Sequence, residues 1–324
     1  MLANGLVHAV LLDGNGGGTF LSAQDALTRT PDQGGVLWLH FDYTDSAAQK
    51  WIVEESGLDA LAADALLTLD TRPRASNIKN SLLIYLRGVN LNPGAAPEDM
   101  IAIRLLVQPN RIISTQKRGL ASVRDLLAAV EQGEGVRTSG GLVADLVDRL
   151  TWYMDEVIAN IEESLSSLEE KTSGRLLVKR NQITDSRRRI VVLRRYLAPQ
   201  REALARLQVE PLGLLSDADK LLVQEAADRL LRLMEDLDMF RDHASLAQEE
   251  LQSQLSDQLN QRMYVLAVLS GLFLPLGFLT GLFGINLGGM PGASNDSAFY
   301  VFVASLSGML MIGGAYLYWR NWFK

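Results

Sequence analysis

The spacing of hydrophobic positions changes along this chain, and the changes divide it into three stretches. In roughly the first 135 residues, short runs of Val, Ile, Leu and aromatic residues are bounded by Gly, Pro, Asn or Asp, which is typical of β-strands. Helical patterns lie at about 45–70 and 119–131. The mixture predicts an α/β or α+β domain at 1–135, with strands at 5–13, 35–42, 81–91, 100–108 and 111–116.

From Gly140 the apolar residues recur every three or four positions, which predicts a long amphipathic helix. A second helix follows Ser173-Gly174 and runs to about Leu207, so we expect 136–215 to form a helical hairpin. Its first arm is acidic and its second is basic, and antiparallel packing would set the opposite charges side by side as a solvated, salt-bridged face. The acids are Asp155, Glu156, Glu162, Glu163, Glu169 and Glu170, and the bases are Lys179, Arg180, Arg187, Arg188, Arg189, Arg194 and Arg195.

A third helix is expected to begin near Ser216-Asp217 and to form a stalk over 216–262. It contains neither Pro nor Gly until Gly271, and it passes into an apolar run without a break signal. At 1.5 Å per residue, a helix from Ser216 to Phe283 would reach on the order of 100 Å, too long for one globule. We therefore expect the stalk to leave the domain, enter a membrane and associate laterally with other helices.

Two stretches of the C-terminal region, 263–283 and 298–319, are each long and apolar enough to cross a hydrocarbon core of about 30 Å. Arg262 precedes the first span, Arg320 and Lys324 follow the second, and the loop 284–297 contains neither Lys nor Arg. By the positive-inside rule, both termini and the tail 320–324 are expected in the cytoplasm and the loop outside. The lipid bilayer is thus a predicted partner.

Composition restricts the chemistry that this chain can perform. With no cysteine, disulfides, thiolate zinc sites and cysteine nucleophiles are excluded, and the three scattered histidines form no short ligand pair. No constellation of residues indicates an enzyme. The net charge of −7, and a basic run without interleaved aromatics, argue against nucleic acid as a partner. A metal handled here is expected to meet oxygen ligands or to remain hydrated.

The first span carries small and polar residues along one helical face, and two such helices alone cannot enclose a water-filled path. A pore would require several copies around an axis, each lining it with Asn260, Met263, Leu266, Ala267, Ser270, Leu274, Gly277 and Gly281. The alternative is that Gly271, Gly277 and Gly281 are close helix-packing contacts. Further back, Asp238, Asp242 and Glu249 are either a solvated face or, around an axis, rings of carboxylates that concentrate cations.

The motif Phe283-Gly284-Ile285-Asn286, with Met290-Pro291 after it, resembles the CorA superfamily of metal-ion transporters, which has a Gly-Met-Asn signature at the outer end of its first span. The Ile variant and the Leu-Gly-Gly-Met-Pro-Gly loop resemble the ZntB branch. The similarity covers essentially the whole chain, since the stretches at 71–74, 86–94 and 97–100 also resemble that branch.

The resemblance implies a homopentamer in the bacterial inner membrane, with a funnel of cytoplasmic α/β domains and a long stalk helix that continues into a two-helix hairpin. Gly284, Ile285 and Asn286 would form the outer selectivity ring, meeting a hydrated cation near Asn286. In this family branch the transported ion is Zn2+, which is a substrate rather than a cofactor, and its uptake is linked to protons. Gly292 follows Pro291 where many magnesium-transporting relatives have an acid, and Asp296 is the loop's one carboxylate.

Two alternatives to zinc uptake remain. One is a CorA-like passive channel for Mg2+, Co2+ or Ni2+ that cytosolic metal gates. The other is a membrane-tethered binding or sensor protein, for which the hairpin would be only an anchor and the polar Gly-Ile-Asn turn would have no purpose.

Overall fold

The computed structural model of the chain describes residues 5–29, 35–69, 72–170, 176–285, 292 and 295–319. The chain divides into two compact units, residues 1–248 and 249–324. The first unit contains a sheet and most of the helices, and the second contains two apolar helical segments. The expected combination of an α/β domain, a long helix and a C-terminal apolar helix is confirmed.

The sheet of the first unit has seven strands in the order β2-β1-β3-β7-β6-β5-β4. The central strands β3 and β7 run parallel, and the other neighbouring pairs run antiparallel. The strands are β1 (Leu6–Leu12), β2 (Gly18–Phe20), β3 (Val36–Asp42), β4 (Arg74–Ile78), β5 (Ser81–Gly88), β6 (Ile101–Val107) and β7 (Arg111–Gln116).

The five strands expected from the sequence are β1, β3, β5, β6 and β7, and each is confirmed within a few residues. The sequence pattern missed the two edge strands. β2 is only three residues long, and β4 has the sequence RASNI, which lacks a run of apolar residues. Edge strands need fewer buried side chains than central strands, so their hydrophobic signal is weak.

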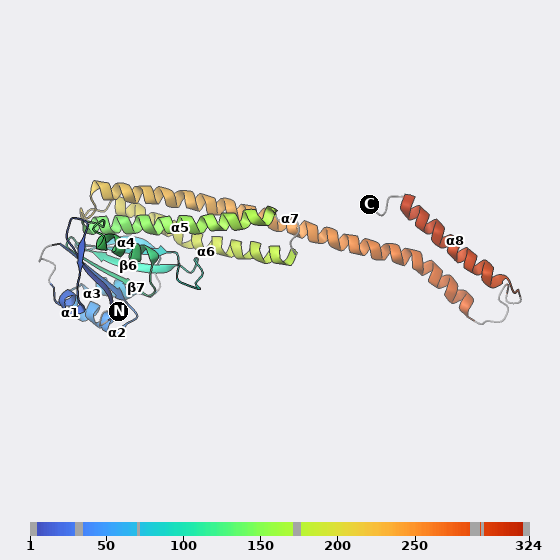
Figure 1. Cartoon of the computed structure of the whole chain (residues 1–324), viewed down its shortest axis with the longest axis horizontal. Helices are drawn as coiled ribbons and strands as arrows, with labels where there is room; N and C mark the ends of the chain where they lie inside the picture. Colours follow the sequence, from blue (N-terminus) through green and yellow to red (C-terminus); the bar gives the residue numbers. More distant parts are fainter. Residues whose placement is uncertain are drawn as a thin grey trace. The chain divides into compact units, whose positions relative to one another are not determined.

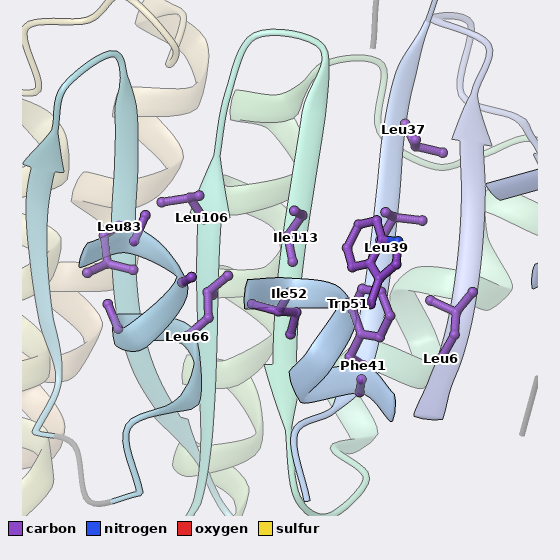
Figure 2. Close-up of a cluster of buried hydrophobic side chains, with 14 of the residues drawn as sticks. Leu6, Leu37, Leu39, Phe41, Trp51, Ile52, Leu66, Leu83, Leu106 and Ile113 are labelled. Atoms are coloured by element: carbon purple, nitrogen blue, oxygen red, sulfur yellow. The ribbon is translucent and has the colours of Figure 1, made fainter. Parts of the chain in front are cut away.

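One face of the sheet is covered by short helices that follow β2 and β3: α1 (Ala23–Thr28), α2 (Ser46–Lys50), the π-helical stretch η2 (Trp51–Glu55) and α3 (Ala60–Leu67). Figure 2 shows Trp51, Ile52 and Leu66 from these helices against side chains of the strands. The rings of Phe41 and Trp51 stack with their centroids 5.1 Å apart. Burial of these apolar side chains attaches the helical layer to the sheet.

The opposite face of the sheet is covered by longer helices, α4 (Ala121–Glu131), α5 (Ser139–Glu170) and α6 (Leu176–Gln208) (Figure 1). α5 and α6 both contact β5, and α6 also contacts β4. A side chain at Gly88 of β5 would collide with Leu150 of α5 and Leu120, which shows how closely α5 approaches the sheet. Because both faces are covered, β3 is buried along almost its whole length.

The long helix α7 (Asp217–Gly284) begins with a capping box, in which Asp219 N–H donates to Ser216 Oγ (3.2 Å) and Ser216 N–H donates to Asp219 Oδ2 (2.9 Å). The turn before it is held by the buried carboxylate of Glu210, which accepts hydrogen bonds from the backbone N–H groups of Leu212, Leu214 and Leu215. The predicted start of the third helix is therefore confirmed, and a side chain fixes the turn that reverses the chain.

The expected charge pairing between α5 and α6 is wrong for the part of the chain that the structure describes. Its arginines turn elsewhere: Arg189 pairs with Glu98 (3.6 Å), and Arg194 pairs with Asp238 of α7 (2.8 Å). The reason is that α5 and α6 meet through their apolar faces, so their charged residues point away from each other. On α5 the buried residues include Met154, Val157 and Ile161, and on α6 they include Ile183, Ile190 and Leu197.

Candidate pore helix and ion entrance

The second unit presents two helical segments that are long and apolar enough to cross a membrane. One is the C-terminal part of α7, and the other is α8 (Ala298–Trp319). Neither 263–283 nor 298–319 contains a charged side chain, and few of their residues are buried within the chain. In water such surfaces would be strongly unfavourable, whereas hydrocarbon solvates them.

α8 lies against one face of α7. Apolar grooves between the two helices are lined on α7 by residues three or four apart, namely Val268, Leu272, Leu276 and Leu279. The rings of Phe283 and Phe302 meet with centroids 5.1 Å apart, and a side chain at Gly313 of α8 would lie 3.5 Å from Leu272 Cδ1. This face of α7 is therefore the one that faces the hairpin partner.

The stripe predicted to line a pore lies on the other side of α7. Successive residues of a helix turn by about 100°, so the mean directions of the two sets of residues differ by roughly 180°. All eight residues of the stripe are exposed, and Met263, Leu266 and Leu274 are 67%, 64% and 72% exposed. The structure thus brings Asn260, Met263, Leu266, Ala267, Ser270, Leu274, Gly277 and Gly281 onto one exposed face, at whose edge Ala267 also lines the groove toward α8.

The glycines of α7 are not packing contacts within this chain. A side chain added at Gly271, Gly277, Gly281 or Gly284 would meet nothing within 4 Å. Close helix approach would instead bring a neighbouring backbone or side chain to such a position, as happens at Gly313 of α8. Helix packing inside the hairpin therefore gives no reason for these glycines.

The expected ion entrance is only partly described. Gly284 is the last residue of α7, Ile285 follows it and is 48% exposed, and Asp296 is exposed two residues before α8 begins. Asn286 and the segment 286–291 lie outside the described residues. Asn295 accepts a hydrogen bond from Ser297 N–H (3.0 Å), an arrangement that leads the chain into α8.

The predicted acidic positions of the stalk differ in their surroundings. Arg194 of α6 forms an ion pair with Asp238, with Nε 2.8 Å from Oδ1, and its Nη2 donates a hydrogen bond to Oδ2 at 2.9 Å. Arg241 lies 3.6 Å from Asp238 and 3.0 Å from Asp242. Glu249 is exposed. Within one chain, then, Arg194 and Arg241 offset the charges of Asp238 and Asp242.

The sequence did not reveal Arg194 as the partner of Asp238. Arg194 belongs to the basic run of α6, which is evident in the sequence. A run of arginines does not indicate which neighbouring helix each side chain contacts. Among the residues that the structure describes, no group of three or more His, Asp or Glu side chains is arranged to hold a metal ion.

Comparison with known families decides the class of protein. A family model described as "CorA-like Mg2+ transporter protein" matches residues 33–320, which is most of the chain. This chain belongs to the CorA family. It is a divalent cation transporter of that family and not an enzyme.

Relatives of this CorA-family chain match it over nearly its whole length. The "Divalent cation transporter CmaX" of Pseudomonas aeruginosa is 38% identical over 96% of this chain and 92% of its own. A "Zinc transport protein ZntB" of Yersinia enterocolitica is 35% identical over 96% of this chain and 93% of its own.

Solved structures confirm the CorA-like fold. The structure titled "structure of the full-length CmaX protein" has a TM-score of 0.82 and 36% identity, and the match covers 98% of both chains. The CorA magnesium transporter from Methanocaldococcus jannaschii has a TM-score of 0.80 at 18% identity, over 96% of this chain and 97% of that one. At 18% identity, the match to the Methanocaldococcus jannaschii structure supports only the fold.

Proposed function

We propose that this chain takes up Zn2+ across the bacterial inner membrane, through the central pore of a homopentamer and coupled to the proton gradient. The observation that carries the proposal is the exposed stripe of α7 opposite the face that α8 covers. A polar side chain such as that of Ser270 is less favourable against lipid than against water. Around a symmetry axis the exposed stripe lines a water-filled path.

Zinc as the ion is supported by the relatives whose names state zinc transport, at 32–35% identity to this chain. Zn2+ is normally bound by histidine nitrogen and cysteine thiolate, and this stripe contains neither histidine nor cysteine. The proposed mechanism therefore keeps the ion hydrated, with Gly284, Ile285 and Asn286 contacting its water shell at the entrance. Asp296 would add negative charge beside that entrance.

The acidic rings enter the proposal in modified form. Glu249 is exposed and free to face a central path, whereas Asp238 and Asp242 each lie beside an arginine. Asp238 would attract a passing cation only when the Arg194 link opens. The stalk is proposed to concentrate cations chiefly at Glu249.

A second candidate function is a passive Mg2+, Co2+ or Ni2+ channel gated by cytosolic metal. It is favoured by the description of the matching family, which names Mg2+. The name of the relative CmaX states divalent cations without choosing one, and the same experiment tests both candidates.

The deciding measurement is metal flux into proteoliposomes that contain the purified full-length protein. Zn2+ and Mg2+ are supplied separately, with and without an imposed pH gradient. Zinc uptake that rises with the gradient is expected. If Zn2+ uptake is the same with and without the pH gradient, proton coupling is rejected. If Mg2+ is taken up and Zn2+ is not, the chain is the passive channel of the second candidate function.

The entrance is tested by Asn286→Ala in the same liposomes. Loss of the amide is expected to lower the flux at least about tenfold, because a hydrogen-bonding partner of the ion's water shell is removed. Asn295→Ala is the matched control, since it removes an amide from the same loop without touching the signature. Wild-type flux in Asn286→Ala, with the oligomer intact, rejects the assignment.

A further inference from the structure

Two charged helix faces of opposite sign have no ion-pair partner inside the described part of the chain, although Arg195 also lies over the ring of Tyr196. We call one the acidic stripe of α5 and the other the basic stripe of α6. Their members are exposed, and no ion pair between described residues involves their charged side chains. The acidic stripe is Trp152, Asp155, Glu156, Ala159, Glu162 and Glu163, and the basic stripe is Arg180, Thr184, Arg188, Val191 and Arg195.

Each stripe combines like charges with one exposed apolar side chain. Trp152 is 55% exposed at one end of the acidic stripe, and Val191 is 61% exposed within the basic stripe. The members recur every three or four residues, so they form continuous ridges along their helices. Ridges of this kind pack into the grooves of a facing helix.

Both stripes point outward from the helical layer. Arg229 of α7 pairs with Asp148 of α5 (2.9 Å), and Arg194 of α6 pairs with Asp238 of α7 (2.8 Å). α7 is thus linked to both helices. Since α5 and α6 bury their apolar faces within the domain, each stripe points outward.

We infer that the acidic stripe of one copy docks on the basic stripe of a neighbouring copy of this chain. The inference rests on the proposed ring of subunits around α7. A contact between two different surfaces closes into a ring when the rotation between copies closes. In such a contact the carboxylates meet guanidinium groups.

The stripes overlap in height at one end. Gln200 Nε2 of α6 lies 3.8 Å from Met154 Sδ of α5, which aligns the two antiparallel helices. Nine residues from this contact, Glu163 of α5 is level with Val191 of α6, and Ala159 is level with Arg195. Rotation about an axis along α7 preserves height, so the segment 159–163 of one copy reaches the level of 191–195 of its neighbour.

Charge complementarity selects a second copy over other occupants. Nucleic acid or an anionic surface would be attracted by the basic stripe but repelled by the four carboxylates of the acidic one. A second copy satisfies both stripes at once.

Cysteine cross-linking tests the contact directly, because the natural chain contains no cysteine. Full-length Glu163→Cys and Val191→Cys chains, whose substituted positions lie at one height, are co-expressed in membranes and mildly oxidised. Disulfide-linked dimers are expected from the mixture and not from either chain alone. The matched control replaces Val191→Cys with Ala205→Cys, which is also exposed on α6 but is about 21 Å further along the helix. Equal cross-linking of both pairs, or of neither, overturns the inference.

Charge reversal provides an independent readout. Glu156→Lys with Glu163→Lys sets like charges against the neighbour, and dissociation of the ring at low salt is expected to rise about tenfold. Adding Arg188→Glu and Arg195→Glu to the same chain should restore the ring, which a merely misfolded domain would not do. Absence of rescue contradicts the inference.

The outcomes separate this inference from the proposed function. A ring that transports Zn2+ but gives no cross-link rejects the stripe contact alone. Cross-links in a protein that moves no Zn2+ into liposomes reject the proposed function and keep the contact.

Discussion

His40 is a buried imidazole on the central strand β3, with no exposed surface. Its Nδ1 lies 2.7 Å from Ser114 Oγ, which also accepts a hydrogen bond from Trp38 Nε1 (2.8 Å). Burial, and to a smaller extent the charge of neighbouring His8, lower the pKa of His40 from 6.5 to about 3. The side chain is therefore neutral in the folded protein at every physiological pH.

This neutral histidine predicts a loss of stability in acid. Below pH 6.5 the unfolded chain protonates at this position while the folded chain does not, so stability present above pH 6.5 is lost as the pH falls toward 3. Between pH 6.5 and 5 the contribution is about 2 kcal/mol. The free energy of unfolding of the full-length protein, followed by tryptophan fluorescence at several pH values, measures this loss of stability.

In His40→Leu the free energy of unfolding should depend less steeply on pH between 6.5 and 5 than it does in the wild type. His243→Gln, at an exposed position on α7, is the control and should keep the wild-type slope. An unchanged slope in His40→Leu would show that other groups produce the acid sensitivity.

At the scale of elements, α7 is a single helix with different surroundings along its length. Its N-terminal part buries Val223, Leu230 and Leu237 within the first unit, whereas its C-terminal part is almost wholly exposed. In the membrane segment the face toward α8 and the opposite face carry different kinds of residue. The faces should consequently differ in contact with water once the protein is assembled.

Thiol labelling in the cysteine-free chain tests this difference. Ser270→Cys and Leu274→Cys, on the uncovered stripe, are expected to react with a water-soluble thiol reagent and to lose metal flux on modification. Leu272→Cys and Leu276→Cys, on the face toward α8, are the matched controls and should react at least about tenfold more slowly, because thiolate formation needs water. Equal reactivity of the two sets would remove the basis for a pore along this stripe.

At the scale of the whole molecule, the basic residues flanking the spans predict which side of the membrane each part occupies. Asp296→Cys, in the loop before α8, should react from outside intact cells with a membrane-impermeant maleimide. Glu131→Cys, exposed at the end of α4, should react only after permeabilisation. The reverse pattern of labelling would contradict the proposed orientation.

Local patterns were sufficient for much of the fold. The buried strands and the long helices were predicted because their apolar residues repeat at the spacing of the secondary structure itself. The edge strand β4 was not, because half-exposed RASNI carries little such signal. For the candidate site, the sequence predicted the stripe of α7 and its Gly284-Ile285-Asn286 entrance. It did not indicate Arg194 as the partner of Asp238.

The sequence by itself determined which segments are strands, which helix is long, and which two stretches are apolar enough for a membrane, since these depend on neighbours a few residues apart. The tertiary structure decided the strand order, with β3 beside β7. It also decided that Arg189 and Arg194 of α6 turn toward Glu98 and toward Asp238 of α7 rather than toward the acids of α5. Such pairings join residues 44 or more positions apart, and only the packing of the apolar helix faces determines which charged side chains meet.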